Sequence, residues 1–166
     1  MVLCWEARLL ACGLWGIPVT VLSFTVEGKA EPQGSARAFM PKAGGRFPIV
    51  TSDNPKLKGW RKAVSFSAMD AMASAGKSMF PFQDGPVTLT VDFYLPRPAT
   101  LKAYAAHLGR PDVDKLARAV GDALTGIVYA DDSQIDMLVV RKGYAAPGTL
   151  PRAEIVVHAT TGGLTW

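Results

Sequence analysis

The spacing of apolar and polar residues predicts six secondary-structure elements. Alternation at every second position, with many β-branched and aromatic residues, is typical of strands. Apolar residues that recur every three or four positions indicate a helix with one buried face. These patterns predict strands over 21–27, 86–95, 134–143 and 152–160, and helices that begin near 54 and at 112 and end at the glycines 76 and 126.

The order of these elements, β-α-β-α-β-β, defines the expected fold class. Interspersed helices and strands predict a two-layer α+β domain whose helices pack on one face of a mixed sheet. Asp53 or Asn54 is the expected N-cap of the first helix, and Asp112 that of the second. Segment 28–48 combines glycine, proline and bases without a periodic pattern, so we expect an exposed irregular loop there.

The first twenty residues differ from the rest of the 166-residue chain. They carry both cysteines and an uncharged run that is too short and too interrupted to span a membrane. The run also lacks the basic start and the cleavage site of a signal peptide. We therefore expect residues 1–20 to be an atypical extension or an over-extended start, residues 21–162 to be the working domain, and the protein to be cytoplasmic without a membrane partner.

Charge is distributed unevenly, although the formal net charge is only +4. Segment 112–136 contains six acidic and two basic residues, whereas segment 29–62 contains eight basic and two acidic ones. A basic body around an acidic patch suits a metal-dependent enzyme that acts on a polyanion, because bases hold phosphates and acids hold a divalent cation. The alternative is a solvated basic loop beside an acidic helix start.

Other kinds of catalytic chemistry have little support in the sequence. Segment 71–78, AMASAGKS, fits a relaxed phosphate-loop pattern, but it ends a predicted helix instead of following a strand, so no nucleotide cofactor is expected. His107 and His158 are far apart and lack metal-ligand spacing. No glycine-flanked serine nucleophile is present. The candidate catalytic residues are therefore carboxylates.

Two acidic pairs are the strongest candidates. Asp112 and Asp114 lie at the start of the second helix, and Asp131 and Asp132 lie in the turn after it. A fold that brings the pairs together needs a cation to offset their repulsion, and hard oxygen ligands select Mg²⁺ or Mn²⁺. Taken separately, the same residues are explained by helix capping, by ion pairs at i,i+4 spacing through Arg118, and by an ordinary turn.

The chain resembles the RusA-type crossover-junction endodeoxyribonucleases, the Holliday-junction resolvases common in phages and prophages. The resemblance rests on the sequences RPDVD at 110–114, DALTG at 122–126 and VYADDSQI at 128–135, and extends over about 21–160. It implies a homodimer that binds four-way junction DNA and nicks two strands symmetrically with Mg²⁺, with Mn²⁺ as a substitute, in DNA recombination and repair.

The resemblance also implies roles for individual residues. The family's three essential aspartates fall on Asp112, Asp114 and Asp132, which are the expected metal ligands and catalytic residues. Arg118 replaces a family lysine, and Lys115 replaces a family asparagine. Arg118 keeps the positive charge for transition-state stabilisation but does not readily donate a proton.

Basic residues outside the acidic cluster are the expected DNA contacts, with strongly salt-dependent binding. They are Lys29, Arg37, Lys42, Arg46, Arg110 and Lys115. Two other functions fit the same residues: a junction-binding protein without catalysis, in which the acids serve as caps, and a broader structure-selective nuclease that also cuts flaps and forks.

Overall fold

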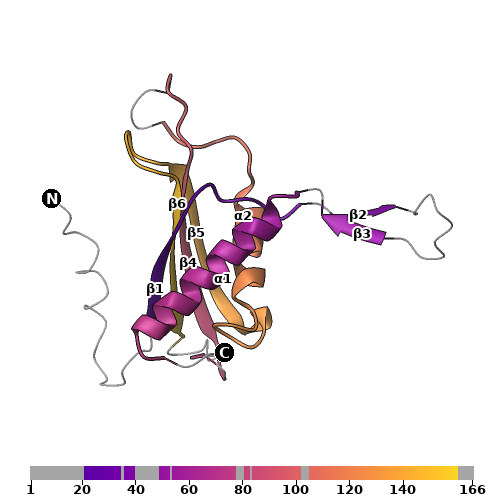
Figure 1. The fold of residues 1–166 in the computed structure, drawn as a ribbon, viewed down its shortest axis with the longest axis vertical. Helices are drawn as coiled ribbons and strands as arrows, with labels where there is room; N and C mark the ends of the chain where they lie inside the picture. Colours follow the sequence, from indigo (N-terminus) through magenta and orange to yellow (C-terminus); the bar gives the residue numbers. More distant parts are fainter. Residues whose placement is uncertain are drawn as a thin grey trace, which may run out of the picture.

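The computed structural model describes residues 21–34, 36–39, 49–52, 54–77, 81–82, 84–101 and 105–160. Within them lie six strands, two α-helices and a single 3₁₀ turn, η2 (Figure 1). In chain order the elements are β1 Val21–Glu27, β2 Ala36–Phe39, β3 Ile49–Ser52, α1 Leu57–Ser74, β4 Val87–Leu95, α2 Val113–Leu124, η2 Asp132–Gln134, β5 Ile135–Tyr144 and β6 Arg152–Ala159.

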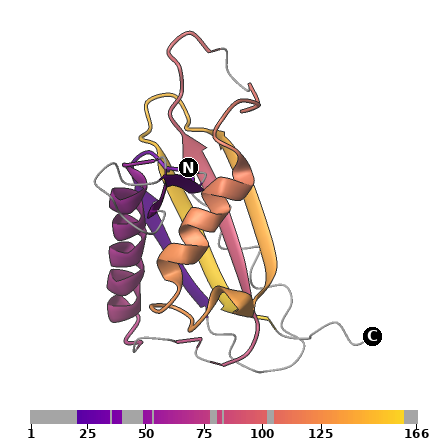
Figure 2. The same ribbon diagram turned by 90° about the vertical axis from the view of Figure 1, so that its right-hand side faces the viewer.

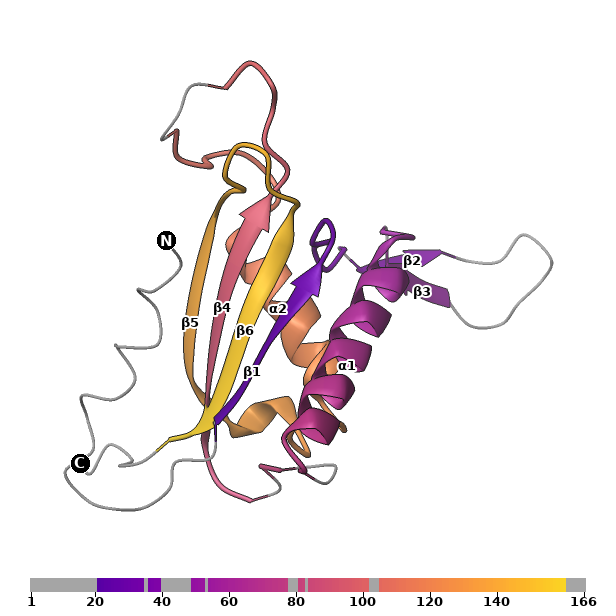
Figure 3. The same cartoon turned by 60° about the vertical axis from the view of Figure 1, so that its left-hand side comes forward.

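Four of the strands form one mixed sheet in the order β1-β6-β4-β5. Strand β6 pairs antiparallel with both β1 and β4, whereas β4 and β5 run parallel. In this strand order β5 lies at one edge of the sheet. Both helices lie on the same face of this sheet (Figures 2 and 3). The predicted α+β class and the two-layer arrangement are confirmed.

The hydrophobic core fills the space between the helices and the sheet. The expected alternation in β1 places Leu22, Phe24 and Val26 inward, and their neighbours in the strand are exposed. Central strand β4 is buried along most of both faces, so Thr88 and Asp92 are buried as well. The helices contribute the apolar side chains at helical spacing: Leu57, Trp60, Val64, Ala68 and Met72 from α1, and Leu116, Ala119, Val120, Ala123 and Leu124 from α2. Within the described residues, no helix is long and apolar enough to cross a membrane.

The prediction of an irregular loop over 28–48 is wrong at residues 36–39. These residues form β2, which pairs antiparallel with β3, and the hairpin projects away from the body of the molecule (Figure 1). Each strand has only four residues, which is too short for a clear periodic pattern. The hairpin depends on pairs from Phe39–Ile49 to Ala36–Ser52, which are ten to sixteen positions apart, and local composition does not reveal such pairing.

The start of α1 also differs from the prediction. Lys56 occupies the N-cap position and makes no side-chain cap. Asn54 instead accepts a hydrogen bond from the Lys56 backbone N–H at 3.1 Å and donates one from its side chain to Glu31 at 3.1 Å. The other end agrees with the sequence, because Gly76 has a positive φ of 63° and follows the last turn. The phosphate-loop-like segment therefore does end a helix.

Candidate active site

Four charged side chains line a hollow of about 370 Å³ between α2, η2 and β5. Asp114, Arg118 and Asp122 come from α2 at a spacing of four residues, which places them on one side of the helix. Asp132 comes from η2. The remaining lining is apolar or small: Leu89, Ala117, Gly121, Ile135 and Leu138. The hollow thus combines three carboxylates and one guanidinium on a largely apolar floor.

Tyr129 anchors the segment that carries Asp132 to the end of α2. Its side chain is fully buried, and its hydroxyl donates a hydrogen bond to the Gly121 carbonyl at 3.0 Å. Burial, with smaller contributions from the charges of Asp132 and Asp122, raises the pKa of Tyr129 well above its usual value. The hydroxyl therefore stays protonated and keeps donating to α2. This contact brings two acidic segments that are distant along the chain to the same hollow.

Asp131 and Asp132 have different structural roles although they are adjacent. Asp131 is the N-cap of η2, and its Oδ1 accepts from the Ser133 backbone N–H at 2.9 Å. Hydrogen bonding from the Ser133 side chain, and then from its backbone N–H, lowers the pKa of Asp131. Gln134 completes a capping box by accepting from the Asp131 N–H at 3.1 Å. Because Asp131 performs the capping, the carboxylate of Asp132 is left exposed at the hollow.

Gln134 also ties this turn to the rest of the domain. Its Oε1 accepts a second hydrogen bond, from the Ala130 N–H at 2.8 Å. Its Nε2 donates to the carbonyls of Phe82 at 3.1 Å and Gly85 at 3.0 Å. The side chain therefore fixes both ends of the turn that presents Asp132. The sequence analysis quoted Gln134 within a motif but gave it no role.

If the acids of α2 had only structural roles, Arg118 would form ion pairs with Asp114 and Asp122, and these pairs are absent from the described residues. Within the described part of the chain, neither Asp114 nor Arg118 has an oppositely charged partner in ion-pair contact. Asp122 is paired instead with Arg61 of α1, which also contacts the Gln33 side chain. Asp114 lies in the first turn of α2, where the helix dipole stabilises negative charge. Asp114 and Arg118 are therefore available to a ligand.

Asp112 has a different setting from Asp114. It occupies the N-cap position of α2, as predicted, but its side chain forms no cap. Its carboxylate lies 3.6 Å from the Lys115 Nζ and is not part of the lining of the hollow. Lys142 of β5 holds the preceding loop by donating to the carbonyls of Gly109 and Pro111, each at 2.8 Å.

The expected DNA contacts are spread over several parts of the chain. Lys29 is exposed and lies 3.7 Å from Glu31. Arg110 is exposed in the loop before α2. Arg37 belongs to β2, although its side chain is not described, and Lys42 and Arg46 lie outside the described residues. Their expected contacts with DNA stay predictions.

The predicted metal site depends on how closely the carboxylates gather at the hollow. Among the described residues, no three side chains of the aspartate, glutamate, histidine or cysteine type gather closely enough to hold one metal ion. Asp114 and Asp132 nevertheless line the same hollow, and Asp112 lies outside it. The metal ligation by all three aspartates stays a prediction.

Sequence reasoning missed Arg61 and underestimated Asp122. Asp122 was counted among the acids, but the only partner considered for it was Arg118. Arg61 is 61 positions earlier and belongs to another helix, so no local spacing indicates the contact. The available signal was the basic run at 56–62, in which four of seven residues carry positive charge.

The domain is thus a mixed sheet covered by two helices, with exposed acids beside a base at one hollow. Comparison with known families identifies the class: the model of the endodeoxyribonuclease RusA family matches residues 29–158. The chain belongs to this family, and the resemblance noted in the sequence is confirmed. It is also similar to the Bacillus subtilis (strain 168) protein "Uncharacterized protein YqaN", with 27% identity over 148 residues, covering 82% of this chain and 95% of that protein.

Proposed function

We propose that this endodeoxyribonuclease resolves four-way DNA junctions by paired symmetric nicks, in a reaction that depends on Mg²⁺. One observation carries the proposal: Asp114 and Asp132, from separate elements, line one hollow together with Arg118. Membership of the family supplies the endodeoxyribonuclease class. The hollow supplies the residues that the chemistry needs.

Asp114 and Asp132 fit a hard divalent cation. Both offer carboxylate oxygens, and Asp114 has no competing ion pair among the described residues. Mg²⁺ commonly binds through one or two carboxylates and completes its coordination with water and substrate phosphate, so two aspartates suffice. Asp112, one residue before α2, is the proposed third ligand. Asp114 and Asp132 would hold the ion, which would supply water activation and charge neutralisation at the phosphate.

Arg118 supplies a fixed positive charge at the same hollow. A guanidinium binds phosphate oxygens through several donors in a planar fork. It therefore stabilises the negative charge that develops on the attacked phosphate, and it does not act as a general acid. Leu89, Ile135 and Leu138 form the apolar part of the lining beside this charge.

The proposed substrate and assembly explain how two nicks are made. A four-way junction has near-twofold symmetry, and a homodimer presents two identical hollows related by a twofold axis. The basic residues Lys29, Arg110 and Lys115 contact the DNA backbone and make binding salt-dependent. Molar-mass measurement by light scattering tests the dimer directly.

The decisive experiment compares Asp132→Asn with Asp131→Asn. A synthetic four-way junction, labelled on each strand in turn, is incubated with protein across a Mg²⁺ titration, with linear duplex and flap DNA as parallel substrates. Asp132→Asn is expected to abolish nicking and to bind the junction at least as tightly as the parent. Asp131→Asn retains an N-cap side chain, so its nicking is expected to fall by no more than about threefold.

Each alternative has a distinct outcome. Nicking by the parent in excess EDTA would refute the metal dependence. Junction binding without any nicking in Mg²⁺ or Mn²⁺ would identify a binding protein. Equal rates on flaps and junctions at the same salt concentration would identify a broader structure-selective nuclease. Full activity in Asp132→Asn would remove the hollow from the mechanism.

A further inference from the structure

A second hollow, of about 610 Å³, lies between α1 and the end of α2. We call it the α1 groove. Its α1 wall carries three bases at helical spacing, Lys58, Arg61 and Lys62, followed by Ser65. The opposite wall is formed by Asp122, Ala123, Thr125 and Ile127. The sequence analysis assigned no function to these bases.

The groove carries a net positive charge that nothing in the described part of the chain neutralises. Its one acidic residue, Asp122, is paired with Arg61. Lys58 and Lys62 are exposed, and neither makes an ion pair with another described residue. The two lysines lie one helical turn apart, so both ammonium groups project from the same side of α1.

Backbone acceptors on the opposite wall are already occupied. Ser65 donates to the Ala123 carbonyl at 2.8 Å. The Leu124 carbonyl accepts from the Ile127 and Val128 N–H groups at 3.0 and 2.9 Å. Among the described residues, neither Lys58 nor Lys62 donates a hydrogen bond to these two carbonyls. Their ammonium groups are available to an anion from solution.

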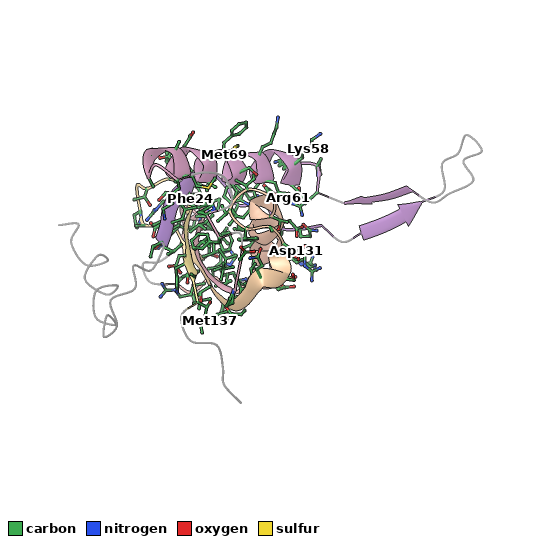
Figure 4. All side chains as sticks on the ribbon, turned by 90° about the horizontal axis from the view of Figure 1, so that it is seen from below. Phe24, Lys58, Arg61, Met69, Asp131 and Met137 are labelled. Atoms are coloured by element: carbon green, nitrogen blue, oxygen red, sulfur yellow. The ribbon has the colours of Figure 1, made fainter. Side chains whose placement is uncertain are left out.

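The α1 groove adjoins the candidate active site. Asp122 lines both hollows, and the Arg61–Asp122 pair joins their walls. Figure 4 shows Arg61 on the side of α1 that faces the segment carrying Asp131, with Lys58 nearer the hairpin. A polymer that runs along the groove thus reaches the hollow beside Asp122. Lys58 and Lys62 offer two successive cationic positions along α1, which suits a backbone of successive phosphates.

We propose that the α1 groove binds the phosphate backbone of the DNA arm next to the cut strand, through Lys58 and Lys62. This inference rests on the proposed nuclease function, because it places the substrate relative to that site. The positive groove holds flanking phosphates, and the acidic hollow beside it holds the cation at the phosphate that is cut. Arg61 keeps Asp122 from repelling the backbone where the two regions meet.

The test measures junction binding in EDTA, where cleavage is absent, by fluorescence anisotropy between 50 and 200 mM salt. The variants are Lys58→Ala, Lys62→Ala and the double variant. Raising the salt over this range lowers duplex affinity by a factor of about 3.5 for each phosphate contact that the protein makes. Loss of both contacts should therefore make the effect of salt on affinity about 12-fold smaller. Lys58→Arg with Lys62→Arg keeps both charges and is expected to restore the parent's salt dependence.

Lys77→Ala is the matched control. Lys77 follows the far end of α1 and donates to the Val21 carbonyl at 2.9 Å. Its removal deletes one positive charge away from the groove, so the salt dependence should equal that of the parent. Thermal unfolding checks that each variant is folded, which is expected because Lys58 and Lys62 are exposed and Lys77 is only partly buried.

The outcomes separate the two proposals. A parent that binds and nicks junctions, with unchanged affinity and salt dependence in the double alanine variant, would overturn the groove assignment and leave the nuclease proposal intact. A parent that binds no DNA would overturn both. An equal loss in Lys77→Ala would show that net charge, and not the groove, governs binding.

Discussion

Replacing Tyr129 with phenylalanine tests the contact that joins the Asp132 segment to α2. The substitution keeps the buried ring and removes one hydrogen bond, the 3.0 Å bond to the Gly121 carbonyl. That carbonyl still accepts from the backbone N–H and the hydroxyl of Thr125, both at 3.1 Å. No buried acceptor is orphaned, so the free energy of unfolding should fall by about 1 kcal/mol at neutral pH.

The dependence of the free energy of unfolding on pH tests the same contact more specifically. Burial raises the pKa of Tyr129 in the folded protein, whereas the unfolded side chain titrates near its ordinary value of 10.0. Above that pH the unfolded chain releases a proton that the folded chain retains. The parent therefore loses stability as pH rises through the unfolded pKa, by about 1.4 kcal/mol per unit.

The phenylalanine variant has no such proton to lose. Its deficit of about 1 kcal/mol should shrink above pH 10 and disappear near pH 11, after which it is the more stable protein. The remaining tyrosines titrate in both proteins and cancel from the difference. The difference in free energy of unfolding between the two proteins is measured by urea unfolding, followed by circular dichroism, at pH values from 7 to 11.5. A difference that stays constant with pH would refute a buried, neutral hydroxyl.

Two further predictions concern contacts that hold the candidate site. Gln134→Ala removes the four described hydrogen bonds of this side chain, so we expect a loss of about 2 kcal/mol in urea unfolding and slower junction nicking. Gln134→Glu keeps a capping acceptor but sets a carboxylate oxygen against the Phe82 and Gly85 carbonyls, so it should lose stability too, and parent-like stability would contradict the donor role of Nε2. Arg61→Met and Asp122→Asn should each cost about 1 kcal/mol, because the pair is roughly one-third exposed. A double-mutant cycle should give a coupling of similar size, and zero coupling would show that the contact contributes nothing.

Elements with a strong local pattern could be predicted from the sequence. The spacing of Leu116, Val120 and Leu124 identified α2 and its buried face, because a helix that covers a sheet needs an apolar stripe. Gly126, with φ of 76°, marked its end. The β2–β3 hairpin could not be predicted in this way, since its short strands are defined by each other and not by local alternation.

The candidate site shows the same division between local and long-range information. The acidic pairs drew attention to Asp114 and Asp132, and the structure places both at one hollow. The division of roles between Asp131 and Asp132 depends on the backbone geometry of η2, which fixes which carboxylate caps. The Arg61–Asp122 pair depends on the packing of α1 against α2, so it emerged only with the tertiary structure.

Pairing of Asp122 determines how regions of opposite charge can lie side by side. An unpaired Asp122 would add a third negative charge to the hollow and would repel DNA phosphates in the α1 groove. Arg61 neutralises it at the shared edge. Under the proposed function, the two remaining carboxylates would then face the cation, Arg118 the attacked phosphate, and the two lysines the DNA backbone. The ion pair would therefore act as a boundary between the two proposed binding regions, in addition to its contribution of about 1 kcal/mol to folding.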